Sequence, residues 1–279
     1  MHTPVLLQQV IEGLMVKPDG KYIDATLGEG GHSLEIIKNG GKVLAIDADK
    51  TQINKAILRI TDYGITNITF VHGNFAEIEK IAKENNFYPV DGVLFDLGLS
   101  MNQINEGKKG LSYRKSDESL DMRLNLETTE PAKDVIRVYN EDSLYEIFSR
   151  FSEDLNSRLI AKTIVEARKK KSISTVGDLM AVINTVVKND NNRSASRIFQ
   201  ALRIFVNKDL DNLIKGLEGA MRVINKGGRI VVICFHSLED RVVKKFIKNN
   251  RLKQINKKII TGDQRLKFER SAKLRVISN

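Results

Sequence analysis

The chain has 279 residues, 41% of them hydrophobic and 29% charged, which is typical of a globular protein with an ample core. The single cysteine, Cys234, excludes an internal disulfide framework. No signal peptide and no apolar run of about 18 residues is apparent. We therefore expect a cytoplasmic protein without a membrane span. The net charge of the chain is +10, and residues 223–279 alone carry +11, with 15 Lys and Arg against 4 Asp and Glu. This clustering favours a polyanionic partner such as nucleic acid over a merely solvated surface.

The first hundred residues alternate between strand and helix patterns. Apolar runs predict strands at residues 21–27, 42–49, 67–73 and 90–98. Helical periodicity between them predicts helices at residues 33–39, 50–63 and 76–86. Because the strands are apolar on both faces and alternate with helices, this order predicts a parallel, doubly wound α/β sheet.

The alternation then stops and returns only at a buried strand pattern, residues 227–237. Between the two regions, helical periodicity without a strand candidate fills residues 131–189 and 197–224. We therefore interpret residues 105–205 as an inserted all-helical domain. Residues 1–104 and 206–279 are predicted to form one discontinuous α/β domain around it.

A further helix pattern follows the late strand at residues 238–250. Four basic residues share one of its faces, at i, i+3, i+4 and i+7: Arg241, Lys244, Lys245 and Lys248. The other face is apolar and carries Val242, Val243, Phe246 and Ile247. The basic face is therefore predicted to lie on a packed helix, available to hold phosphates. Short alternating runs up to residue 279 are compatible with final edge strands.

The string DATLGEGGHS, residues 24–33, joins the first predicted strand to the first helix. Glycine-rich loops in this position usually hold a ligand through main-chain N–H groups. Gly28 and Gly30 match two glycines of the dinucleotide motif, but Ser33 replaces the third, and no P-loop string is present. Asp24 and Glu29 occur here without Lys or Arg, which disfavours a pyrophosphate and suits a cation such as the sulfonium of S-adenosylmethionine.

Further candidates follow the other strands at their carboxyl ends, where sheets of this kind bind ligands. Asp47 lies 19 residues after Gly28 and is placed to accept hydrogen bonds from ribose hydroxyls, a spacing that fits NAD as well as S-adenosylmethionine. Phe75, after the third strand, is a candidate contact for adenine, and Asp96 ends the fourth strand. His32 either contacts the ligand, caps its helix or faces solvent.

Several strings along nearly the whole chain resemble the bacterial 16S ribosomal RNA cytosine-N4-methyltransferases: HTPVLL, DATLGEGGHS, VHGNF, DGVLFDLGLS, GLSYR with LDMRL, FQALRIFVN, FHSLEDR and SAKLR. The resemblance implies a class I, Rossmann-like methyltransferase sheet with an inserted helical domain. It implies S-adenosylmethionine as cofactor, and N4 of a decoding-region cytidine in 16S ribosomal RNA as the target, within the small ribosomal subunit. A role of the insertion in RNA recognition is a reasonable hypothesis.

The same resemblance implies a set of cofactor-binding residues: Gly30, Gly31, His32, Asp47, Phe75, Asp96 and Gln103. The sequence departs from the family in two places. Met101 stands where a second serine usually follows Ser100, and residues 116–119 lack a proline and are one residue longer than usual. Asp121 and Arg123 persist beyond this loop, where they shape the target pocket or simply pair with each other.

Methyl transfer to a cytosine amine requires in-line placement and acceptors for the amine N–H groups. The Asp-or-Asn-Pro-Pro-aromatic motif of many amino-methyltransferases does not follow the fourth strand, so Asp96 and Ser100 are the candidate acceptors. Asp96 contacts either the amine or the cofactor. His236 is a further catalytic candidate, with the equal alternative that it starts a helix beside an N-cap Ser237. No metal site is expected, and the target base is expected to leave its stack.

Three other functions stay open from the residues alone. A nicotinamide dehydrogenase is disfavoured by Ser33 and by the acidic loop. A non-catalytic RNA-binding or ribosome-assembly protein with a relic nucleotide site would carry the same basic charge. A DNA methyltransferase would use the same chemistry and is opposed only by the family resemblance.

Overall fold

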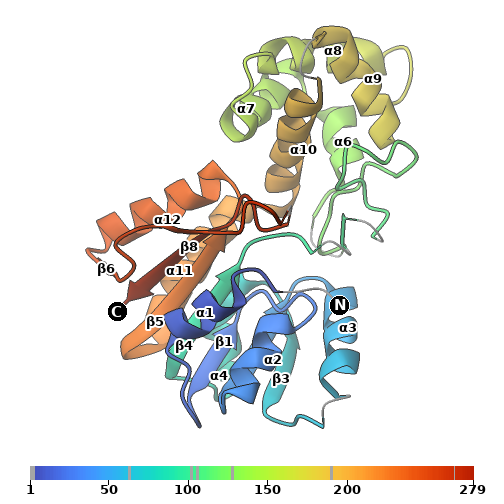
Figure 1. The fold of residues 1–279 in the computed structure, drawn as a ribbon. Helices are drawn as coiled ribbons and strands as arrows, with labels where there is room; N and C mark the ends of the chain where they lie inside the picture. Colours follow the sequence, from blue (N-terminus) through green and yellow to red (C-terminus); the bar gives the residue numbers. More distant parts are fainter. Residues whose placement is uncertain are drawn as a thin grey trace. The chain divides into compact units, whose positions relative to one another are not determined.

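The computed structural model describes residues 4–61, 64–100, 103–104, 107–126, 129–188, 191–266 and 268–279. The chain divides into two compact units. One unit consists of Met1–Gly98 and Leu210–Asn279, and the other of Leu99–Asp209 (Figure 1). The bounds of the second unit are slightly wider than the predicted insertion of residues 105–205.

A single mixed sheet forms the centre of the first unit, with the order β3-β2-β1-β4-β5-β8-β6 and with β7 paired to β8. Strands β1 to β5 are parallel, and β8 runs antiparallel to β5. This order confirms the predicted class I methyltransferase type of sheet. The strand order reverses between β1 and β4, and ligands of such sheets bind beyond the carboxyl ends at that point. The strands are β1 (Lys21–Asp24), β2 (Lys42–Asp47), β3 (Ile68–His72), β4 (Val90–Asp96), β5 (Ile224–Cys234), β6 (Lys253–Gln254), β7 (Ile260–Thr261) and β8 (Lys273–Ser278).

Helices cover both faces of this sheet (Figure 1). One hydrophobic core joins the sheet to α1 (Leu7–Leu14), α2 (Gly31–Lys38) and α3 (Lys50–Thr61). The other joins it to α4 (Ile78–Glu84), α11 (Asp209–Val223) and α12 (Ser237–Asn249). Neighbouring strand residues alternate between the cores, as with Tyr22 and Ile23, because successive side chains of a strand point to opposite faces.

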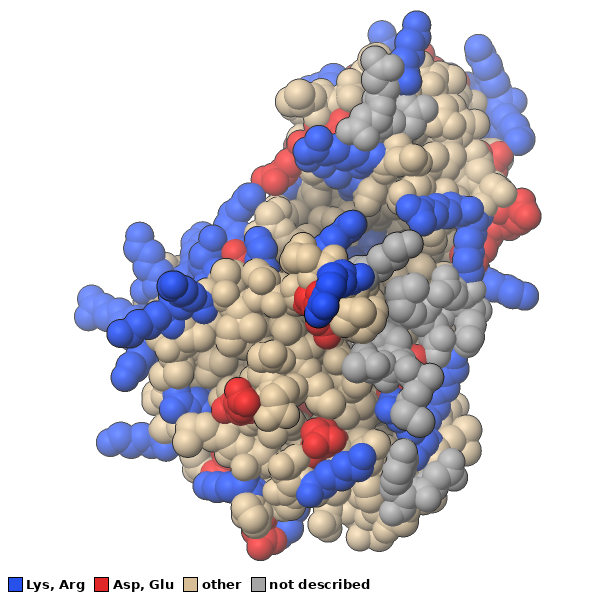
Figure 2. Space-filling model, viewed as in Figure 1, with Lys and Arg blue, Asp and Glu red and all other residues tan. Residues whose placement is uncertain are grey.

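The amphipathic helix predicted at residues 238–250 is present as α12. Val243 and Phe246 are buried in the core, whereas all four basic residues of the opposite face are exposed. Figure 2 shows Lys and Arg side chains projecting where Figure 1 draws α12 and β6. The basic face of α12, defined as Arg241, Lys244, Lys245 and Lys248, therefore lies on a packed element.

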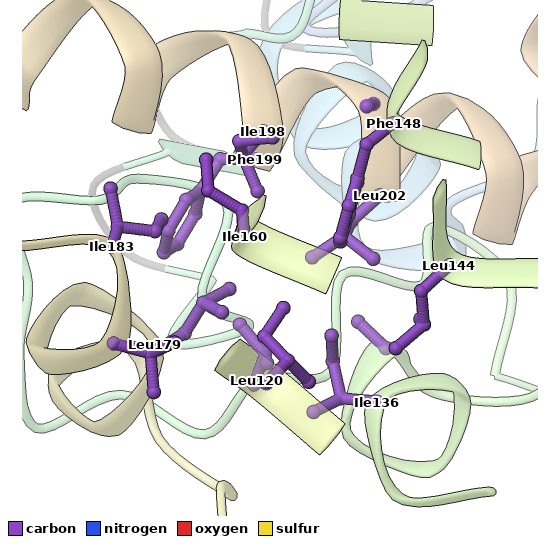
Figure 3. Packing of buried hydrophobic residues seen from close by; sticks show 14 of the residues in the cluster. Leu120, Ile136, Leu144, Phe148, Ile160, Leu179, Ile183, Ile198, Phe199 and Leu202 are labelled. Carbon is purple, nitrogen blue, oxygen red and sulfur yellow. The ribbon is translucent and has the colours of Figure 1, made fainter. Parts of the chain in front are cut away.

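The second unit is helical, as predicted for the insertion. Its helices are α6 (Ala132–Val138), α7 (Glu141–Ser152), α8 (Ser157–Arg168), α9 (Val176–Val186) and α10 (Asn191–Asn207). They enclose a core that includes Leu120, Ile136, Phe148, Ile160 and Phe199 (Figure 3). Leu120 and Met122 anchor the preceding irregular segment, residues 107–126, by packing fully buried into this core.

Side-chain caps define where two of these helices begin. Asn140 accepts a hydrogen bond from Ser143 N over 2.8 Å at the start of α7. Thr175 and Asp178 form a reciprocal capping box at the start of α9, which satisfies main-chain donors that the helix itself leaves unpaired. Within the part of the chain that the structure describes, every helix is too short or too polar to cross a lipid bilayer.

Candidate active site

The glycine loop is held by carboxylates at the ends of two neighbouring strands. At the end of β1, Asp24 accepts hydrogen bonds from Ser33 Oγ at 2.7 Å and from Thr26 N at 3.2 Å. At the end of β2, the two oxygens of Asp47 accept from Gly28 N and Asp49 N, each at 2.8 Å. Gly28 adopts a φ of 52°, a conformation that glycine takes without steric cost. Both acids therefore fix the main chain of the loop.

His32 lies in the first turn of α2 and is 6% exposed. Its Nε2 lies 2.9 Å from the carbonyl oxygen of Val5, and a carbonyl can only accept, so Nε2 carries the hydrogen. The other ring nitrogen, Nδ1, faces Asp96 Oδ2 at 3.7 Å. Asp96 N donates to Thr26 Oγ1 at 2.6 Å. The structure thus brings His32 and Asp96 together at the carboxyl ends of the strands.

Burial raises the pKa of Asp24, Asp47 and Asp96 to about 6 in each case. Asp24 is 1% exposed, while the side chain of Asp96 keeps 19% exposure; loss of hydration is the largest cause of the raised pKa at all three acids. At Asp96 the nearby charges of Asp24 and Glu239 raise the pKa further, and His32 lowers it. Oδ1 of Asp96 is buried without a hydrogen-bond partner among the described residues. A bound cation would stabilise this group of carboxylates.

Phe75 lies at the end of β3, at the start of a short 3-10 turn, Phe75–Glu77. Its ring meets Phe95 edge-on, with the ring centroids 5.7 Å apart. Gly216 of α11 packs against it so closely that an added Cβ would lie 2.8 Å from Phe75 Cδ2. The ring remains partly exposed, as a contact for adenine requires.

Ser100 and Gln103 belong to the second unit, and the structure shows their local geometry there. Ser100 N donates to Gln103 Oε1, and Gln103 N donates to Ser100 Oγ, each at 3.0 Å. Met101 lies outside the described residues. Asp121 and Arg123, in the same unit, form a bidentate ion pair at 2.7 and 2.9 Å, which agrees with the expectation that they pair with each other.

His236 is the N-cap of α12, and Ser237 is not, contrary to the predicted alternative. Its Nδ1 accepts from Glu239 N at 3.4 Å, and its Nε2 lies 2.8 Å from Glu239 Oε1. Oε2 of Glu239 also accepts from Phe235 N at 2.7 Å. The same oxygen accepts from His236 N at 3.3 Å, which completes a capping box in which a histidine takes the place of the usual serine. The catalytic role of His236 stays a prediction.

Two contributors were missed from the sequence. Glu239 is 3% exposed and organises the β5–α12 turn; its position three residues after the cap was a usable signal. Thr26, two residues after the end of β1, accepts a hydrogen bond from Asp96 N, and no local sequence pattern indicates such a contact. Among the described residues, no group of His, Cys, Asp or Glu is arranged to hold a metal ion.

A sequence model of the MraW methylase family matches residues 1–279. The chain belongs to this family. A relative named ribosomal RNA small subunit methyltransferase H from Clostridium botulinum (strain Loch Maree / Type A3) is 44% identical over 249 residues, covering 87% of this chain and 80% of the relative. Ribosomal RNA small subunit methyltransferase H 1 from Acholeplasma laidlawii (strain PG-8A) is 43% identical over 251 residues, covering 89% and 82%.

A more distant likeness is found among solved structures. The crystal structure of a ribosomal RNA methylase from Streptococcus thermophilus has a TM-score of 0.49 and 11% identity, with 100% of this chain and 98% of that chain covered. The class I methyltransferase type of sheet in this chain follows from its own strand order.

Proposed function

We propose that this MraW-family methylase transfers a methyl group from S-adenosylmethionine to N4 of a cytidine in the decoding region of 16S ribosomal RNA. The observation that supports the cofactor is the group of three carboxyls with raised pKa values, Asp24, Asp47 and Asp96, around a loop without a basic residue. Such a site favours a sulfonium and an ammonium over a pyrophosphate. The names of the relatives support ribosomal RNA of the small subunit as the acceptor.

The cofactor contacts follow from the ends of successive strands. Gly30, Gly31 and His32 begin α2 and present the main chain of its first turn. Asp47 keeps acceptor capacity for ribose hydroxyls, because each carboxylate oxygen can accept more than the one hydrogen bond described above. Phe75 offers a ring for adenine, and Asp96 and Gln103 complete the proposed set.

S-Adenosylmethionine supplies an electrophilic methyl group on its sulfonium. The protein must then place a cytosine amine in line and accept its N–H groups, since the lone pair of that amine is delocalised into the ring. Asp96 is suited to this task because Oδ1 has no partner among the described residues and the pKa is near 6. Ser100 is the second proposed acceptor, and His236 the third catalytic candidate. Asp96 contacts either the amine or the cofactor in this scheme.

The RNA is proposed to bind partly through the basic face of α12. Phosphate contacts of this kind position RNA without reading its sequence. The helical second unit is proposed to contribute to RNA recognition, and the assembled small ribosomal subunit is the proposed context of the reaction. A cytoplasmic location is proposed on the same ground.

The direct test is methyl transfer from labelled S-adenosylmethionine to small ribosomal subunits purified from a strain that lacks this protein, and to RNA extracted from them. The products are digested and their nucleosides identified by mass spectrometry. We expect N4-methylcytidine with the wild-type protein and a large loss with Asp96→Asn. Another methylated nucleoside would contradict the proposed target. Cofactor binding without any methylation of RNA, but with methylation of DNA, would favour the DNA alternative.

A further inference from the structure

The segment Pro4–Leu6, here called the N-terminal strap, precedes α1 and packs against the first turn of α2. An added Cβ on Gly31 would lie 2.4 Å from Pro4 Cγ, so the strap leaves no room for a side chain at that position. Val5 and Leu6 are 6% and 5% exposed. Leu6 has a φ of 51°, which a leucine adopts only when its surroundings hold it there.

Glu269, near the other end of the chain, holds the strap in this conformation. Its Oε1 accepts from Leu6 N at 3.0 Å, and its Oε2 accepts from Asp263 N at 3.1 Å. The residue is 8% exposed. The carboxylate therefore binds two main-chain donors, one from the strap and one from its own loop. A carboxylate with both oxygens occupied in this way has a fixed orientation.

The strap in turn determines the state of His32. The carbonyl of Val5, which belongs to the same peptide group as the Leu6 N–H that Glu269 binds, accepts from His32 Nε2 at 2.9 Å. This contact places the hydrogen on Nε2 and leaves Nδ1 facing Asp96 Oδ2 at 3.7 Å. If the strap moved, the ring would lose the acceptor that selects this tautomer.

We propose that Glu269 is a positioning residue of the cofactor site. By holding Leu6 N it fixes the Val5 carbonyl, and through that carbonyl it fixes the tautomer and orientation of His32 beside Asp96. The consequence for cofactor affinity rests on the proposed function, whereas the effect on His32 does not. The C-terminal loop thereby contributes to a site built from the amino-terminal half of the sheet.

The test uses two variants that break the contact between Glu269 and Leu6 from opposite sides. Glu269→Ala removes the acceptor. Replacing Leu6 by its α-hydroxy acid turns the amide N–H into an ester oxygen, which removes the donor while the contact between Glu269 and Asp263 remains. The ester also makes the Val5 carbonyl a weaker acceptor for His32, so a change of tautomer supports the proposal only where Glu269→Ala shows it as well. Asp263→Ala is the matched control, because it alters the same loop through a side chain that pairs with Arg265 and leaves the strap untouched.

The first readout is the tautomer of His32, measured by nitrogen-15 NMR of the histidine rings in the protein without cofactor. We expect the Nε2–H form in the wild type and the control, and a mixture of tautomers in both test variants. The second readout is calorimetric binding of S-adenosylmethionine, which we expect to weaken about tenfold in both variants. If Glu269 had only a structural role, its substitution would lower the melting temperature without shifting the histidine signals.

An unchanged His32 tautomer together with wild-type affinity in the ester variant would overturn the proposal, even if Glu269→Ala failed to fold. A changed tautomer in a protein that binds no S-adenosylmethionine in any form would instead contradict the proposed cofactor and leave the positioning role of Glu269 standing.

Discussion

The main-chain N–H of Gly28 donates to Oδ2 of Asp47 over 2.8 Å, which joins the glycine loop after β1 to the end of β2. The other oxygen of the same carboxylate binds Asp49 N. Asp47 therefore shapes the loop, and in the proposed function it also offers acceptors to a ligand. The two roles together would account for an acid with a raised pKa at this position.

Substitution of Asp47 should accordingly affect stability and binding together. Asp47→Ala leaves the amides of Gly28 and Asp49 without their acceptors, which costs about 1–3 kcal/mol for each buried donor. We expect a lower free energy of unfolding and at least a tenfold weaker affinity for S-adenosylmethionine. Asp47→Asn keeps one acceptor oxygen, so its free energy of unfolding and its affinity should lie between those of the wild type and Asp47→Ala. Denaturant unfolding and calorimetry measure these effects, and an affinity unchanged in Asp47→Ala would refute the assignment.

The stability of the protein without cofactor should depend on pH through Asp24. Burial raises its pKa from 3.8 to about 6, so the folded state binds this proton more tightly than the unfolded state does. The resulting stabilisation is fully present below about pH 4 and is lost as the pH rises through about 6, by about 3 kcal/mol.

Asp24→Asn should remove this part of the pH dependence, whereas Asp117→Asn, at an exposed position, should retain it. The measurement is the free energy of unfolding at several pH values between about 4 and 7, compared as the difference between variant and wild type. Identical slopes for Asp24→Asn and the wild type would show that this carboxyl is not the titrating group.

Gly216→Ala should displace the ring of Phe75, against which Gly216 packs. The new Cβ would lie 2.8 Å from Phe75 Cδ2 and 3.1 Å from Phe95 Cε1, so the aromatic pair must shift. We expect the KM for S-adenosylmethionine to rise several-fold, with little change in kcat. Gly219→Ala, three residues along the same helix, is the control, because its Cβ meets Ile78 Cγ2 at 2.6 Å instead. Equal effects of the two substitutions on KM would argue against a specific link to Phe75.

Charge reversal on the basic face of α12 should weaken RNA binding. In Lys245→Glu with Lys248→Glu, two phosphate contacts are replaced by repulsion, so affinity should fall and the salt dependence of binding should decrease by about two ion equivalents. Filter binding to small-subunit RNA at several salt concentrations measures both. An unaltered salt dependence would place the phosphates elsewhere on the protein.

A separate pair of charge reversals tests whether the helical second unit contributes to RNA binding. Lys169→Glu with Lys170→Glu changes two exposed residues after α8. Arg168 is unsuitable, because its guanidinium donates to the carbonyls of Ile136 and Tyr139 and thereby closes the end of α6. We expect weaker RNA binding with unchanged S-adenosylmethionine affinity. If RNA affinity stayed at the wild-type level, the unit would not contact RNA at this point.

The sequence predicted the sheet because the inner parallel strands β1, β2, β4 and β5 contain apolar runs, and a strand buried on both faces leaves that pattern. The edge strand β3 is only partly buried. It also predicted the acids of the site, since Asp24, Asp47 and Asp96 each close such a run. The histidine cap of α12 was assigned one residue away, because serine is the commoner cap and Ser237 is adjacent. Glu269 gave no signal at all: its partner Leu6 is 263 residues away, and such contacts exist only after folding.

The most direct test of the account is calorimetric binding of S-adenosylmethionine, with NAD as the comparison ligand, across about pH 5 to pH 7. Three carboxyls with pKa values near 6 must lose their protons to attract a cation. We therefore predict that S-adenosylmethionine binds, that its affinity rises with pH over this interval with release of protons, and that NAD does not bind. An affinity for S-adenosylmethionine that is absent or independent of pH, or a preference for NAD, would contradict it.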